Sequence, residues 1–142
     1  MIVQRGCSAL RTIQRTVIGC FMLASLACSQ ESAIWLAPNA TADHIVFLVG
    51  HRRGDTGGSE AVTTLDVTTC ADTDRTHSDH FWGIYRGSND IPLHVVQYGI
   101  APRGFNQNHT ALPLIPGCYR ARVSGTGRVR FMVSRNGQVT EL

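Results

Sequence analysis

Short alternating runs of apolar and polar residues follow one another along most of the chain. From His44 onward these runs are rich in Val, Ile, Phe and Tyr and are separated by Gly, Pro, Asn and Asp, without a sustained helical periodicity. We expect strands at residues 44–50, 60–69, 80–86, 93–99, 118–124, 128–134 and 138–141. Such a series of short strands predicts an all-β domain in which two antiparallel sheets pack face to face.

The predicted hairpin at 118–134 has an apolar and a basic face on each strand. The expected inward residues are Tyr119, Ala121, Val123, Val129, Phe131 and Val133, and the expected outward residues are Arg120, Arg122, Arg128 and Arg130. A three-residue turn, Gly125-Thr126-Gly127, pairs Val123 with Val129 and so matches the faces of the two strands. We expect its last residue, Gly127, to adopt a positive φ, which glycine accepts without a steric penalty.

This register sets Arg122 directly opposite Arg130 on the outer face of the hairpin. Like charges in that position repel each other, so acids from a neighbouring strand or an anionic partner should lie over the arginines. A face that is simply solvated is the alternative.

The first 27 residues have the pattern of an export signal. Arg5, Arg11 and Arg15 precede an apolar run from Val17 to Ala27. A membrane-spanning helix needs roughly 20 apolar residues, and this run is too short for one. We therefore expect a signal peptide that is removed by cleavage.

Ser25-Leu26-Ala27-Cys28 resembles the lipobox of bacterial lipoproteins. The resemblance implies cleavage before Cys28 and a lipid, such as palmitate, on its sulfur, which anchors the protein in a membrane. Ser25 departs from the commonest form, which has Leu at that position, so an ordinary secretory signal that leaves Cys28 as a plain thiol is the alternative. Ser29 is not the Asp that retains lipoproteins in the inner membrane, and we expect the outer membrane.

The chain after the signal peptide is long enough for one domain and not for two. We expect a tether at 28–43, in which Ile34-Trp35-Leu36 is apolar enough to add a short edge strand, and a single small β-sandwich of immunoglobulin-like type at 44–142. Trp82 and Ile84 are expected in its core, on the sheet opposing the hairpin. Asn136-Gly137 suits a type I′ turn before the last strand.

Three cysteines remain after cleavage: Cys28, Cys70 and Cys118. If Cys28 carries lipid, the other two are an even pair in an oxidising compartment, where a disulfide is the usual fate of paired cysteines. We therefore predict a Cys70–Cys118 bridge, with two unpaired buried thiols as the alternative.

Charge excludes one class of partner. Beyond residue 27 the chain carries ten arginines, no lysine and ten acids, so its formal net charge is zero and no nucleic-acid partner is indicated. The charges are segregated, because residues 91–140 hold six arginines and no acid. Guanidinium groups favour bidentate contacts with carboxylate or phosphate.

Three segments near the C-terminus carry a resemblance to a known group of proteins. Residues 98–105 (YGIAPRGF), 113–119 (PLIPGCY) and 131–133 (FMV) resemble the C-terminal part of small uncharacterised bacterial lipoproteins, which are predicted sandwiches without an assigned activity. Pro116-Gly117-x-Tyr119 also resembles the start of a tyrosine-corner strand in immunoglobulin-like domains. The resemblance implies a fold and an envelope location but no function. We expect no cofactor.

Two segments contain residue types used in catalysis or metal binding. The segment from 72 to 80 offers the possible zinc, copper or calcium ligands Asp72, Asp74, His77, Asp79 and His80. A polar surface loop is the simpler interpretation, because the glycine of a calcium loop is missing. Asp55-Thr56-Gly57 is the tripeptide of aspartic proteases, but it occurs once and does not follow an apolar strand directly.

The sequence as a whole favours a non-enzymatic lipoprotein of the bacterial cell envelope, acting as a binding or structural module. Its expected partners are a membrane, through Cys28, and an unknown envelope protein or anionic ligand at Arg120, Arg122, Arg128 and Arg130. A periplasmic metal-binding protein using the 72–80 segment and a small aspartic-type hydrolase are the alternatives.

Overall fold

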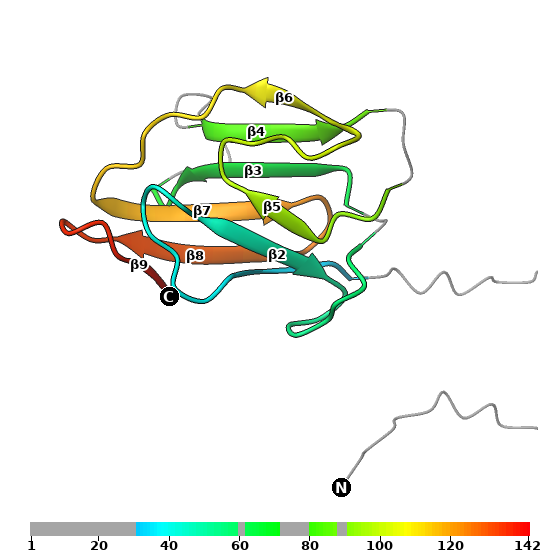
Figure 1. Ribbon diagram of the computed structural model, residues 1–142, viewed down its shortest axis with the longest axis horizontal. Helices are drawn as coiled ribbons and strands as arrows, with labels where there is room; N and C mark the ends of the chain where they lie inside the picture. Colours follow the sequence, from blue (N-terminus) through cyan, green and yellow to red (C-terminus); the bar gives the residue numbers. More distant parts are fainter. Residues whose placement is uncertain (1–30, 60–61, 72–79, 88–90) are drawn as a thin grey trace, which may run out of the picture.

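The computed structural model describes residues 31–59, 62–71, 80–87 and 91–142. Its strands are β1 (Ala33–Leu36), β2 (Val46–Gly50), β3 (Thr64–Thr69), β4 (His80–Arg86), β5 (Val95–Gln97), β6 (Phe105–His109), β7 (Gly117–Val123), β8 (Arg128–Val133) and β9 (Val139–Glu141) (Figure 1). They form a three-stranded sheet in the order β1-β2-β5 and a six-stranded sheet in the order β6-β4-β3-β7-β8-β9. The pairings within both sheets are antiparallel.

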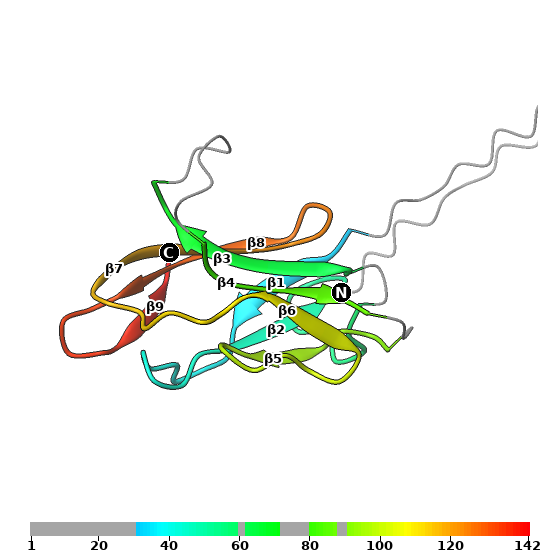
Figure 2. The ribbon, with the colours of Figure 1, turned by 90° about the horizontal axis from the view of Figure 1, so that it is seen from above.

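The two sheets lie one over the other as the layers of a small β-sandwich (Figure 2). The predicted all-β, two-sheet fold is therefore confirmed. None of the described residues forms a helix long and apolar enough to cross a membrane. The edge strand expected at Ile34–Leu36 is present as β1, which pairs with β2.

The sequence did not indicate β6. Phe105 is its one buried residue, and Asn106 to His109 are exposed. A strand at the edge of a sheet with one covered position lacks the apolar alternation by which strands are recognised.

The core lies between the sheets and is closed by aromatic residues from both. Phe47 on β2 contacts Phe131 on β8 with ring centroids 5.9 Å apart, and Tyr119 on β7 stacks on Phe131 at 5.6 Å. All six inward residues expected in the β7–β8 hairpin are buried. Trp82 and Ile84 are also fully buried, but the expectation that they belong to the opposing sheet is wrong, because β4 is part of the same six-stranded sheet.

The predicted register of the hairpin is wrong by two residues. Ala121 pairs with Val129 and Arg122 with Arg128, so each residue still faces the expected side. The turn has the expected length but consists of residues 124–126, since the Val123 amide donates to the Gly127 carbonyl, and the positive φ of 92° belongs to Gly125. Gly127 is needed for another reason: a Cβ there would lie 2.5 Å from the Ser32 carbonyl oxygen.

The second turn also differs from the expected type I′. The Gly137 amide donates to the Ser134 carbonyl, the Ser134 amide donates to the Gln138 carbonyl, and Gly137 has a φ of 78° while Asn136 keeps a negative φ. This is the pattern of a three-residue loop with glycine in the left-handed region.

Two tyrosines fix the segment that leads into β7. The Tyr119 hydroxyl donates to the Ile115 carbonyl four residues upstream at 2.9 Å, as the resemblance to a tyrosine corner implies. The Tyr98 hydroxyl lies 2.7 Å from the Leu112 carbonyl oxygen and 3.0 Å from that of Phe81. Burial is the main cause that raises the pKa of Tyr98 well above its usual range, so this hydroxyl remains a hydrogen-bond donor at any ordinary pH.

Candidate anion-binding face

The outer face of the six-stranded sheet carries two rows of polar residues that cross its strands. Since Leu65, Val67, Tyr119 and Ala121 point into the core, the residues that alternate with them point outward. The first row is Arg130, Arg120, Thr68 and His80, and the second row is Arg128, Arg122, Asp66, Gly83 and His109. We call the arginine part of the two rows, Arg120, Arg122, Arg128 and Arg130, the basic face.

The basic face consists of arginines that stand directly opposite each other. Arg120 pairs with Arg130 and Arg122 pairs with Arg128 across the two strands. Arg128 and Arg130 are exposed, and Arg120 and Arg122 are half-buried. Cys70, Arg120, Arg128 and Arg130 line a shallow depression of about 450 Å³. The arrangement concentrates guanidinium donors over one open hollow, as a site for a carboxylate or a phosphate requires.

Arg120 is held in place by the end of β3. Its Nη2 atom donates to the Cys70 carbonyl at 3.0 Å, and Cys70 is joined to Cys118 on β7 by the predicted disulfide, with Cα atoms 5.3 Å apart. The Cys70 amide also donates to the Cys118 carbonyl. The disulfide therefore ties two neighbouring strands of one sheet beside the basic face, whereas that of antibody domains joins the two sheets.

An acid from a neighbouring strand lies beside the arginines. This is one of the two arrangements that the repulsion between the arginines predicts, and the other is an anionic partner. Asp66 on β3 pairs in register with Arg122 on β7. Burial raises the pKa of the Asp66 carboxyl above its usual range, while the charges of His80, His109 and Arg122 act in the opposite direction. Asp66 is therefore the acid that lies next to Arg122 on the neighbouring strand.

On the part of the outer face without arginines, polar side chains surround Gly83. A Cβ at this glycine would lie 2.5 Å from Asn108 Oδ1 and 2.7 Å from Asp66 Oδ1, so a larger residue would push these side chains apart. The rings of His80 and His109 stack with centroids 4.5 Å apart and an interplanar angle of 9°. Thr68 Oγ1 and His80 Nδ1 are buried without a hydrogen-bond partner among the described residues.

The described side chains of this face do not by themselves gather into a metal site. Nowhere in the described ranges do three or more His, Cys, Asp or Glu side chains lie close enough together to hold a metal ion. His80 is at the start of β4, and the other proposed ligands, Asp72, Asp74, His77 and Asp79, lie outside the described residues, as does Cys28. Metal binding by the 72–80 segment stays a prediction.

Asp55 makes the contacts of a residue that stabilises a turn. Its carboxylate accepts hydrogen bonds from the backbone amides of Gly57 at 3.0 Å and His51 at 3.1 Å. These bonds lower the pKa of the carboxyl. A catalytic aspartate of the aspartic type instead shares a proton with a second carboxyl. The hydrolase alternative stays a prediction without support from these contacts.

Sequence reasoning missed Asp66, Asn108 and His109 as members of this face. Asp66 alternates with two apolar residues of β3, and this pattern does indicate an outward carboxylate, but not that β3 lies next to β7. Asn108 and His109 belong to β6, which has no recognisable strand pattern. Comparison of the chain with protein-family models, with curated proteins and with solved structures finds no match.

Proposed function

We propose that this protein is a lipid-anchored, non-enzymatic binding module of the bacterial cell envelope that holds an anionic ligand on its basic face. The observation that carries the proposal is the register of β7 and β8, which sets Arg120 opposite Arg130 and Arg122 opposite Arg128. Like charges directly opposite each other destabilise a sheet. A bound anion removes this repulsion, and the ligand and the fold then stabilise each other.

The dimensions of a sheet suit a ligand with more than one negative group. Neighbouring strands are about 4.8 Å apart, and alternate residues of one strand are about 6.8 Å apart, so the arginine side chains start from the corners of a small rectangle. Each guanidinium offers a planar fork of donors to a carboxylate or phosphate. Arg120 is already fixed by the Cys70 carbonyl, and a side chain that is ordered before binding loses less entropy.

The proposed location rests on the N-terminal sequence and on the cysteines. The signal-like segment, the lipobox-like Ser25-Leu26-Ala27-Cys28 and the Cys70–Cys118 bridge are each expected of an exported lipoprotein. Ser29 favours the outer membrane over the inner one.

Lipid attachment is tested in a bacterium that has the lipoprotein pathway. Labelled palmitate should be incorporated into the wild-type protein and not into the Cys28→Ser variant, which should also lose its membrane association. Palmitate on the Cys28→Ser variant, or a mature N-terminus at another residue without lipid, would contradict the proposed anchor.

Anion binding is tested by calorimetric titration of the protein with tripolyphosphate at low salt. We expect Arg130→Gln to weaken binding about fivefold or more, because it removes one charge-assisted contact. Arg135→Gln is the matched control, since Arg135 is equally exposed but lies in the β8–β9 turn away from the basic face. Equal affinities for the two variants would show that tripolyphosphate does not bind at the basic face.

A further inference from the structure

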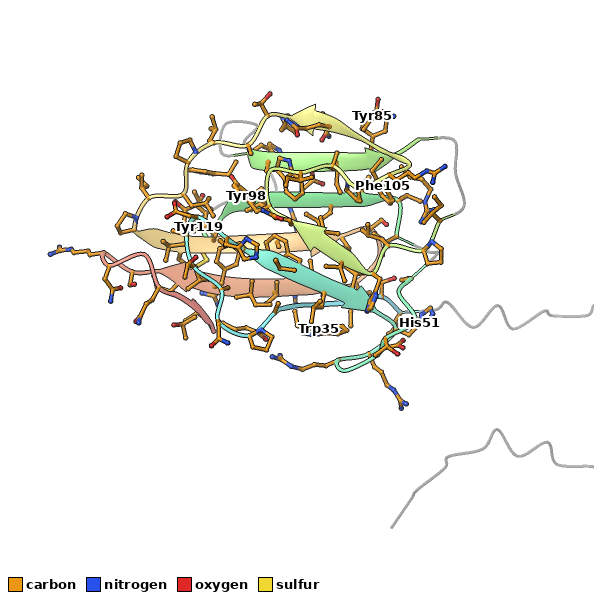
Figure 3. All side chains as sticks on the ribbon, in the orientation of Figure 1. Trp35, His51, Tyr85, Tyr98, Phe105 and Tyr119 are labelled. Atoms are coloured by element: carbon orange, nitrogen blue, oxygen red, sulfur yellow. A yellow bond between two sulfur atoms is a disulfide. The ribbon has the colours of Figure 1, made fainter. Side chains whose placement is uncertain are left out.

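One end of the sandwich gathers the start of the described chain and two loops. Residue 31, the loop 51–59 and the β7–β8 turn lie at the right of Figure 1, whereas the β8–β9 turn lies at the opposite end. His51 marks the same end among the labelled side chains of Figure 3. We call residues 31–33, 50–59 and 124–128 the tether end.

Close contacts fix Ser32 to both loops of the tether end. Ser32 is buried, and its hydroxyl lies 3.0 Å from that of Ser59. On the other side, the Ser32 carbonyl lies so close to Gly127 that no side chain fits there. Ser32 is therefore packed against the sandwich, and β1 follows it directly.

Chain length then limits how far the domain stands from a lipid on Cys28. Four residues lead from Cys28 to Ser32, and a fully extended chain of this length spans about 14 Å. In each leaflet the headgroup and interfacial region is about 5–8 Å thick, since the whole bilayer of about 40–45 Å includes a hydrocarbon core of about 30 Å. A lipid on Cys28 thus holds the tether end within about 10 Å of the headgroups, close enough for it to meet them.

The tether end has the charge and shape to accept a lipid phosphate. Its cations are Arg52, Arg53 and Arg128, its acids are Glu31 and Asp55, and Arg122 lies next to it at the end of β7. Arg53 forms an ion pair with Glu141, and the Asp55 carboxylate is engaged by backbone amides. Arg122 and Arg128, together with residues 123 and 125–127 of the glycine-rich hairpin end, line a hollow of about 340 Å³.

We propose that the tether end docks on the anionic phospholipid headgroups of the membrane that holds the lipid anchor, with a phosphate between Arg122 and Arg128. The inference rests on the proposed lipid at Cys28. Arg52 is exposed on the loop 51–59 and adds a second contact to the same surface. Arg130 lies further along β8 and pairs with Arg120, so this half of the basic face stays open to a soluble ligand while the domain is docked.

The test uses the lipidated mature protein, reconstituted into vesicles of pure phosphatidylcholine and into vesicles with one third phosphatidylglycerol. Hydrogen exchange of the backbone amides at 124–127 reports docking. We expect slower exchange in the vesicles with phosphatidylglycerol, and loss of this protection in 1 M salt, where charges are screened beyond about 3 Å. Arg128→Gln should lower the ratio of docked to undocked protein about fivefold, the usual effect of one basic residue at an anionic surface.

Arg135→Gln is the matched control, because Arg135 is an equally exposed arginine beyond the other end of β8 and should leave the protection unchanged. Equal exchange in the two kinds of vesicle would overturn the docking while leaving the lipid anchor intact. Equal protection by inorganic phosphate in phosphatidylcholine vesicles would also overturn it, in favour of a site for free phosphate. Protein that lacks palmitate and fails to float with either kind of vesicle would overturn the anchor and the docking together.

Discussion

Truncation of Phe131 tests the packing between the two sheets. The Phe131 side chain is fully buried and lies between Phe47 of the opposing sheet and Tyr119 of the neighbouring strand. A buried aromatic side chain removes about 150 Å² or more from water, which corresponds to about 4 kcal/mol at ~25 cal/mol per Å². This agrees with the loss of about 3–5 kcal/mol that is typical of Phe→Ala in a core, where a cavity remains.

Arg130 provides the matched control, because it directly precedes Phe131 and points to the other side of the sheet. Urea denaturation followed by tryptophan fluorescence should show that Phe131→Ala lowers the free energy of unfolding by about 3–5 kcal/mol, while Arg130→Ala stays within about 0.5 kcal/mol of wild type. Domains are stable by only about 5–15 kcal/mol, so Phe131→Ala should unfold at a much lower urea concentration than wild type. A comparable loss of unfolding free energy in both variants would mean that Phe131 is not buried between the two sheets as described.

Two further predictions concern the disulfide and the acid beside the basic face. The Cys70–Cys118 bridge closes a loop with a sequence separation of 48, so replacement of both cysteines by alanine should lower the free energy of unfolding by about 4 kcal/mol, and denaturation curves unchanged by a reductant would contradict this. Asp66 has a raised pKa, so the folded state binds its proton more tightly than the unfolded state, and stability is lost as pH rises from about 4 through the raised value. The stability of Asp66→Asn relative to wild type should therefore increase between pH 4 and pH 7, and a decrease in matched urea curves would show that the charged carboxylate is stabilising instead.

Alternation along a strand determines its faces but not its register. The inward residues of β7 and β8 were predictable because each apolar residue alternates with an arginine. A shift by two residues leaves every side chain on the same face, and the sequence within the hairpin does not distinguish the two pairings. The position of the turn depends on the close approach of Ser32 to Gly127, a contact between residues far apart in the chain.

The division of strands between the sheets is a second property that alternation does not reveal. Inward residues of either sheet have the same pattern, which is why Trp82 was expected on the wrong sheet. The stacking of His80 on His109 could not be predicted from the sequence for a related reason. His80 and His109 meet because β6 pairs with β4 and because the register of β4 shifts on both of its sides, near Val67/Thr68 and Gly83/Ile84.

The order of the strands explains why the basic face keeps its positive charge. Most acids of the mature chain precede Ile91 and most arginines follow it. The six-stranded sheet brings these two parts together between β6 and β4 and, on the side of the arginines, along the boundary between β3 and β7. Asp66 meets Arg122 at that boundary. Arg128 and Arg130 are one strand further away, and β9 on their other side places Thr140 next to Met132. Among the described residues, the arginines of β8 therefore have no acid on a neighbouring strand of this face, and each of the proposed ligands engages at least one of them.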